Sequence, residues 1–168
     1  MAKTTKKTVV KKTKAATVKT VKKAAAKKAK IGFTVKTGKE ITATFPDSTG
    51  LTAKVAAAIA AENVNILAAT GYSASEMRRM ATFTLIVDDL VRAERALEKI
   101  GATDIQESSI VLVETPNKVG SLKVISKLIA DAGINIYYFY STTSSGKTAT
   151  CVFKTADDKK TMKILREA

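Results

Sequence analysis

Two loops of the sequence combine residue types that can hold a carboxylate. In each loop a proline is followed four residues later by a glycine, after which an apolar helical pattern begins; the loops run from Pro46 to Gly50 and from Pro116 to Gly120. Glycine at a strand-to-helix turn permits a positive φ or the close approach of a ligand, and the helix that follows presents free N–H groups and the positive end of its dipole. Such a corner suits an anionic group.

The residue inventory excludes most forms of catalysis. The 168 residues contain no His and one Cys, so neither a Ser-His-Asp or Cys-His relay, nor a Cys/His zinc site, nor an intrachain disulfide can be built. The acid pairs Asp88-Asp89 and Asp157-Asp158 fall where helices should begin, and we interpret them as caps rather than metal ligands. Cys151 lies in an apolar stretch and is interpreted as a small buried hydrophobe. We therefore expect no enzyme activity, no metal and no cofactor.

The sequence shows no signal for membrane insertion or secretion. The longest purely apolar run, from Val55 to Ala61, is far shorter than the ~20 residues that cross a bilayer. No short apolar core follows the basic start, as it would in a signal peptide. We expect a cytoplasmic protein.

Charge divides the chain into two parts. Residues 1–30 hold 12 Lys and no acidic residue, which leaves 17 of the 29 basic residues and all 15 acidic ones in 31–168. A segment so charged and without aromatic residues is predicted to be a disordered basic tail. It could be a solubilising extension, an imperfect organellar presequence, or an arm that binds DNA or RNA phosphates without reading sequence. Candidate phosphate contacts are Lys11, Lys12, Lys22, Lys23, Lys27 and Lys28.

The remaining 138 residues contain an internal repeat. A shift of 70 places, without a gap, matches Pro46 with Pro116, Gly50 with Gly120, Ile59 with Ile129, Ala60 with Ala130, Asn65 with Asn135, Ile66 with Ile136, Phe83 with Phe153, and Asp88 with Asp158. A period of this length is too long for a solenoid unit and indicates a duplicated small domain.

Both copies predict the same order of elements, βαββα. The first copy predicts a strand over 41–45, a helix over 51–62, strands over 64–73 and 80–87, and a helix over 88–100. The second predicts a strand over 110–114, a helix over 121–132, strands over 134–142 and 148–155, and a helix from 157.

These segments resemble a known family. Pro-Asn-Lys-Val-Gly-Ser-Leu at 116–122 and Ala-Gly-Ile-Asn-Ile at 132–136, echoed at 46–51 and 63–66, are similar to the ACT domain, a ferredoxin-like βαββαβ module that commonly binds amino acids and regulates enzymes. The resemblance runs from about residue 40 to the C-terminus. It implies an α+β fold of two tandem modules, 31–104 and 105–168, with antiparallel sheets and helices on one face. Thr49 and Val119 depart from the family, which often has Pro before the loop Gly.

The resemblance also implies a ligand site. In ACT-like binding the amino acid lies between modules or subunits, held by the loop and by the Asn that opens the next strand. The corresponding residues are Asn117, Lys118, Val119, Gly120, Ser121, Leu122, Asn135 and Ile136 in the second copy, and Asp47, Ser48, Thr49, Gly50, Leu51, Asn65 and Ile66 in the first. Asp47 would accept from a ligand ammonium but repel a carboxylate, so the two sites need not be equivalent. The plainer alternative is that each loop is a turn and each Asn bonds local backbone.

The second copy lacks a closing strand, which would leave a sheet edge with unpaired N–H and C=O groups. Three segments could cover it: Ile31 to Lys36, which alternates like a strand and is predicted to turn at Thr37-Gly38; Asp104 to Glu114, as one long strand closing the first module and opening the second; or a partner chain. We favour the N-terminal strand together with dimerisation.

A run of four aromatic residues extends from Tyr137 to Tyr140. Strand alternation places Tyr138 and Tyr140 on the opposite face from Tyr137 and Phe139. We expect some of them to line a module interface, with base stacking as the alternative. Together the patterns predict a regulatory homodimer that senses a small amino acid; the alternative is a nucleic-acid-associated protein whose modules serve for dimerisation.

Overall fold

The computed structural model describes residues 32–73, 79–143 and 146–168. Within these residues all six strands form one antiparallel sheet in the order β2-β3-β1-β4-β6-β5. The elements are β1 (Thr34–Pro46), α1 (Leu51–Ala61), β2 (Ile66–Ser73), β3 (Met80–Val87), α2 (Leu90–Lys99), β4 (Asp104–Pro116), α3 (Ser121–Asp131), β5 (Ile136–Thr142), β6 (Thr148–Thr155) and α4 (Asp158–Arg166). The predicted basic tail, with its candidate lysines, lies outside the described residues.

Two long strands join the modules. β1 and β4 pair with each other from Thr34↔Glu114 to Thr44↔Asp104, and each also pairs through its second half with a strand of one module, β1 with β3 and β4 with β6. The first half of β4 therefore closes the first module, and the first half of β1 closes the second. The fold is two ferredoxin-like modules in tandem, and the predicted long strand and N-terminal closing strand are both confirmed.

The predicted turn at Thr37-Gly38 is wrong, because β1 continues through it. Gly38 pairs with Ile110 in the middle of the long ladder. A Cβ added at Gly38 would lie 2.8 Å from Leu112 Cδ1, so this glycine permits a close approach of a neighbouring side chain rather than a reversal of the chain.

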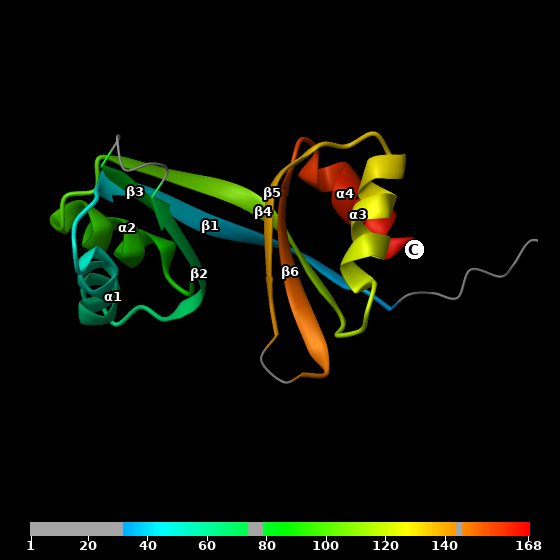
Figure 1. Ribbon diagram of the computed structural model, residues 1–168, viewed down its shortest axis with the longest axis horizontal. Helices are drawn as coiled ribbons and strands as arrows, with labels where there is room; N and C mark the ends of the chain where they lie inside the picture. The colour runs from blue at the N-terminus through cyan, green and yellow to red at the C-terminus, as the bar shows by residue number, and fades with distance from the viewer. Residues whose placement is uncertain (1–31, 74–78, 144–145) are drawn as a thin grey trace, which may run out of the picture.

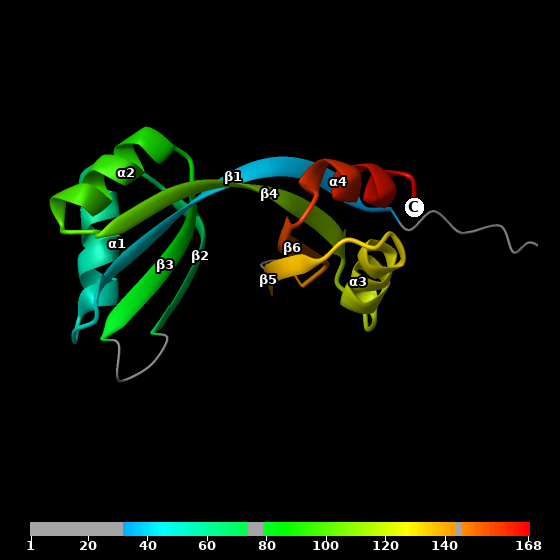
Figure 2. The same ribbon diagram turned by 90° about the horizontal axis from the view of Figure 1, so that it is seen from above.

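Alternation along the strands sends apolar side chains toward the helices. Ile41, Ala43 and Phe45 of β1 pack with Val55 of α1 and Leu97 of α2. In the second module Val111 and Phe153 pack under α3 and α4 in the same way. Each fully buried side chain of this size contributes about 1.5–3 kcal/mol. The four helices cover one face of the sheet, and the bare face curves so that β2 and β3 are turned toward β5 and β6 (Figures 1 and 2).

The helices begin in two different ways. Asp89 and Asp157 cap α2 and α4, accepting from Arg92 N at 3.0 Å and Lys160 N at 2.8 Å, so capping is confirmed for these two acids. α1 and α3 instead start after Gly50 and Gly120, which have φ of 84° and 88° and provide no side-chain cap.

The prediction that the two copies align without a gap is wrong, because the offset between them changes within the β-hairpins. Leu85 lies between Ile41 and Ala69 in the sheet, and Phe153 lies between Val111 and Phe139. The outer partners are 70 residues apart (111 − 41 and 139 − 69), but the central ones are 68 apart (153 − 85). The β2–β3 hairpin is two residues longer than the β5–β6 hairpin, so Phe153 corresponds to Leu85 and not to Phe83.

Among the described helices, none combines the length and the apolar character needed to traverse a bilayer.

Candidate functional site

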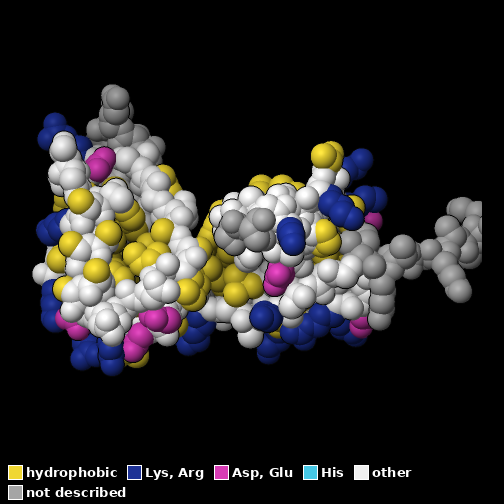
Figure 3. All heavy atoms as spheres, turned by 90° about the horizontal axis from the view of Figure 1, so that it is seen from below, with side chains coloured by type: hydrophobic (Ala, Val, Ile, Leu, Met, Phe, Trp, Pro, Cys, Tyr) yellow, Lys and Arg dark blue, Asp and Glu magenta, His cyan; other side chains and the backbone are white. Residues whose placement is uncertain are grey.

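A cavity of about 930 Å³ lies between α1 and β2 in the first module. Figure 3 looks onto this lobe and shows a hollow with hydrophobic side chains. Five predicted residues line the cavity: Asp47, Ser48, Gly50, Leu51 and Ile66. Thr49 and Asn65, predicted with them, are exposed and are not part of its lining. The structure thus brings most of the first predicted set together.

One end of the cavity is polar. The start of α1, from Gly50 to Ala53, forms part of the wall, and this helix has neither a side-chain cap nor an acidic residue in its first turn. Leu51 N donates to the Ser48 carbonyl at 3.2 Å. The N–H groups of Thr52 and Ala53 and the positive end of the dipole therefore lie at the cavity wall without a competing carboxylate of the helix itself. Asp47 and Ser48 add an acceptor and a hydroxyl beside them. Together these groups can hold a carboxylate and an ammonium side by side.

The other end of the cavity is apolar. Its lining includes Val55 of α1 and two cross-strand pairs, Ala69 with Leu85 and Gly71 with Phe83, of β2 and β3. A Cβ at Gly71 would lie 2.9 Å from Phe83 Cε1, so the ring occupies the space that a side chain would need. These residues were not predicted from the sequence. The available signal was the small size of Ala69 and Gly71, at strand positions where a core strand normally has large side chains.

The side chains of the second loop form hydrogen bonds with the protein's own backbone. Asn117 Nδ2 donates to the Gly146 carbonyl at 3.2 Å, and Ser121 Oγ donates to the Pro116 carbonyl at 2.7 Å. Val119 is fully exposed. The Ser121 bond lies within the loop, whereas the Asn117 bond joins the loop to the connection between β5 and β6.

A separate depression of about 490 Å³ in the second module includes Asn135 and Ile136 together with Lys123 and Lys127 of α3. None of the loop residues 117–122 lines it. The structure therefore does not bring Asn135 and Ile136 into one cavity with Lys118, Gly120 or Leu122.

The two predicted asparagines bond through their backbones. Asn65 N donates to Asp88 Oδ1 at 2.9 Å, and the Asn65 carbonyl accepts from Asp88 N at 3.2 Å. The Asn135 carbonyl accepts from Ala156 N at 2.9 Å. Asn65 thus joins the start of β2 to the connection between β3 and α2, and Asn135 joins the start of β5 to the connection between β6 and α4. Both residues are exposed.

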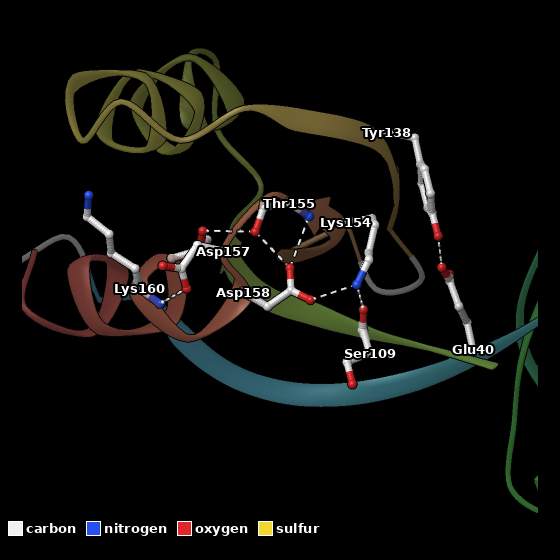
Figure 4. Close-up of polar contacts among 9 residues, drawn as sticks. Glu40, Ser109, Tyr138, Lys154, Thr155, Asp157, Asp158 and Lys160 are labelled. Carbon is white, nitrogen blue, oxygen red and sulfur yellow. Dashed lines mark hydrogen bonds and ion pairs between the residues drawn. The ribbon is translucent and has the colours of Figure 1, made fainter.

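A third arrangement lies on the bare face of the sheet, between the modules. Glu40 of β1 is completely buried, and Tyr138 Oη donates to its Oε1 (Figure 4). Tyr140 Oη donates to its Oε2 at 3.0 Å. The predicted alternation and the position at a module interface are confirmed for these two tyrosines. Glu40 was not predicted from the sequence. The signal was present in the repeat, since Glu40 stands where the second copy has the buried Ile110.

Burial and the neighbouring carboxylate affect both phenols. Burial, followed by the hydrogen bond and the charge of Glu40, raises the pKa of Tyr138 well above its usual value. Burial and the charge of Glu40 raise the pKa of Tyr140 in the same direction. Both hydroxyls therefore stay protonated and able to donate at neutral pH.

Comparisons with known proteins identify the fold. No family model matches the chain, and no curated protein matches it. Solved structures do. A Bacteroides thetaiotaomicron protein matches with a TM-score of 0.70 and 22% identity, covering 79% of this chain and 89% of its own. The aspartokinase alpha and beta subunits match at 0.61 and 19%, covering 83% and 95%. The ligand-free regulatory subunit of aspartate kinase from Thermus thermophilus matches at 0.60 and 17%, covering 83% and 99%. The chain shares its fold with these proteins.

Proposed function

We propose that the protein is a non-enzymatic regulator that binds a small amino acid in the cavity of the first module. The observation that carries this proposal is the meeting of the α1 start, which has no side-chain cap, with Asp47 and Ser48 at one end of a 930 Å³ cavity whose other end is apolar. A zwitterion with a short side chain matches this division into a charged end and an apolar end.

The ligand orientation follows from the charges. Its α-carboxylate would accept from the N–H groups at the start of α1, where an anion is stabilised by the helix dipole. Its ammonium would donate to Asp47, and Ser48 could bond either group. The side chain would lie against Val55 and Phe83. The loop from Asn117 to Leu122 would then serve as a turn, so one ligand per chain is expected.

The structural neighbours support a regulatory role. Two of them are named as a regulatory subunit of aspartate kinase, one in a ligand-free form, and the chain covers almost all of each. A protein of this kind works by coupling ligand binding to a second equilibrium, typically with a coupling free energy of about 1–3 kcal/mol.

We propose that the second equilibrium is dimerisation at the edge of β2. This strand ends one side of the sheet, lines the cavity, and exposes Leu67 and Tyr72, which are 60% and 57% accessible. A second copy placed there would pair with free backbone groups and cover the mouth of the cavity. Sedimentation velocity with and without ligand measures this directly, and an unchanged sedimentation coefficient would contradict it.

The binding proposal is tested by calorimetry of the full chain against the twenty amino acids. At least one should bind with one site per chain. Ala69→Phe, which fills the apolar end, should weaken that binding at least tenfold. Ala57→Phe adds the same bulk to an exposed position of α1 outside the lining and should leave binding unchanged. Absence of heat with all twenty, or equal binding by Ala69→Phe and wild type, would refute the proposal.

A further inference from the structure

A second cavity, of about 360 Å³, lies on the opposite face of the sheet from the helices. Threonine hydroxyls of the first module line one side, and Tyr138 and Tyr140 of β5 line the other. The threonines are Thr42, Thr70 and Thr84. This inter-module cavity is separated from the proposed amino-acid cavity by strand β2, whose Thr70 and Tyr72 contribute to both.

Behind the two tyrosines lies a buried carboxylate. In both of its hydrogen bonds Glu40 is the acceptor and a phenol the donor, which is the pattern of an ionised side chain. Two neutral donors do not cancel a charge, and a buried charge without a counter-ion is costly. Glu40 therefore has a negative charge that its hydrogen bonds share but do not neutralise.

The nearby lysines are engaged elsewhere. Lys39, the preceding residue in β1, pairs with Glu107 at 3.1 Å. Lys154, which lies opposite Tyr138 in the sheet, pairs with Asp158 at 3.0 Å and donates to the Ser109 carbonyl at 2.8 Å (Figure 4). In the described part of the chain, the five ion pairs do not include Glu40. The lining of the inter-module cavity contains no basic residue either.

The tyrosines can transmit this charge to the inter-module cavity. Each phenol that donates to Glu40 keeps oxygen lone pairs that can accept, and donation to an anion strengthens a hydroxyl as an acceptor. The ring faces also attract cations. Thr42 and Thr84, whose hydroxyls are 3.1 Å apart, add further acceptors on the facing wall.

We propose that the inter-module cavity binds a small organic ammonium ion, held by the phenol oxygens of Tyr138 and Tyr140 and compensating the buried charge of Glu40. The ligand is an amine rather than an amino acid, because a free carboxylate would meet the field of Glu40 with no basic side chain in the lining. Such a ligand would touch both modules and fix their separation.

Three probes of matched shape test this proposal on the full chain: benzylamine, benzyl alcohol and benzoate. Chemical-shift titration should show saturable binding of benzylamine, at least tenfold weaker binding of benzyl alcohol, and none of benzoate at the same concentration. Glu40→Gln keeps an acceptor for the tyrosines but removes the charge, and should weaken benzylamine binding at least tenfold. Glu107→Gln removes a part-exposed carboxylate of the neighbouring strand and should have no effect.

Two further variants define the location. Tyr138→Phe removes one phenol oxygen and should weaken benzylamine binding at least fivefold, which keeps the test valid if Glu40→Gln fails to fold. Ala69→Phe fills the amino-acid cavity and should bind benzylamine like the wild type. Failure of benzylamine to bind, equal binding of the alcohol, unchanged binding by both Glu40→Gln and Tyr138→Phe, or loss of binding in Ala69→Phe would overturn the proposal.

Discussion

Ala69 and Phe139 occupy equivalent positions in the two modules. Each lies on an edge strand, Ala69 on β2 opposite Leu85 and Phe139 on β5 opposite Phe153. Ala69 lies next to Leu85, whereas Phe139 stacks on Phe153 with ring centroids 5.9 Å apart and an interplanar angle of 23°. The small residue leaves the apolar end of the first-module cavity open, and the large ring fills the corresponding space in the second. The two modules therefore share a fold but differ in the space beside their loops.

Phe139→Ala should lower the free energy of unfolding without changing amino-acid binding in the first module. Removing a fully buried Phe costs about 3–5 kcal/mol, and the ring of Phe139 is 50% exposed, so a loss of about 2 kcal/mol is expected. Urea denaturation measures the loss, and calorimetry should give an affinity within twofold of wild type. A tenfold loss of amino-acid affinity would show that the ligand site is in the second module.

Gly71→Ala should both destabilise the protein and weaken amino-acid binding. The new methyl group would contact the Phe83 ring at 2.9 Å, which forces the ring toward the cavity; overpacking of this kind costs roughly 1–3 kcal/mol. Gly32→Ala is the matched control, because nothing lies within 4 Å of a Cβ there. Thermal unfolding and calorimetry of the two variants provide the comparison. Equal melting temperatures would contradict the packing argument.

The sequence predicted what local patterns and the repeat determine. Strands 80–87 and 148–155 have the predicted bounds, and Asp89 and Asp157 cap helices as expected. The loop at Asp47 and Ser48, which the turn glycine before a helix indicated, lines the first-module cavity.

Features that depend on the sheet were not predictable in this way. Phe153 corresponds to Leu85 only when a gap of two residues is placed in the hairpin. That gap is defined by the strand pairing, which a comparison of the two copies without gaps does not include. Glu40 and Tyr138 are 98 residues apart, and β4 and β6 lie between their strands in the sheet, so their contact depends on how strongly the sheet curves. The turn predicted at Gly38 is wrong because its closeness to Leu112 arises only in the folded chain and leaves no signal in the sequence.

Stability should fall above pH 10 because of Tyr138 and Tyr140. Both have pKa values raised in the folded state, chiefly by burial and by Glu40, whereas the unfolded chain releases these protons near pH 10. The folded state then holds more protons than the unfolded one, so this stabilisation is fully present below pH 10 and is lost as pH rises. For each fully buried group, the free energy of unfolding would fall by at most about 1.4 kcal/mol per pH unit, and these part-exposed side chains should contribute less.

The measurement is the urea midpoint between pH 9 and 11 for the wild type and for the double variant Tyr138→Phe, Tyr140→Phe. The double variant should show the shallower decline, since it retains every lysine but lacks the two phenols. Tyr137→Phe, at a 63% exposed residue beside the register shift of β5, serves as the control and should decline like the wild type. Parallel declines in all three proteins would contradict the role of the two buried phenols.

Thr115→Val should stabilise the protein by about 1 kcal/mol. Among the described residues, Thr115 Oγ1 is a buried side-chain oxygen with no hydrogen-bond partner, and the residue is 2% exposed. Burying a hydroxyl without a hydrogen bond costs its desolvation free energy, and a methyl group of similar size removes that cost. Thr34→Val, at an exposed strand position, should change the free energy of unfolding by less than about 0.5 kcal/mol. If Thr115→Val destabilised the protein in urea denaturation, the hydroxyl would have a partner in solution, and a water or ligand beside Pro116 would be the first group to look for.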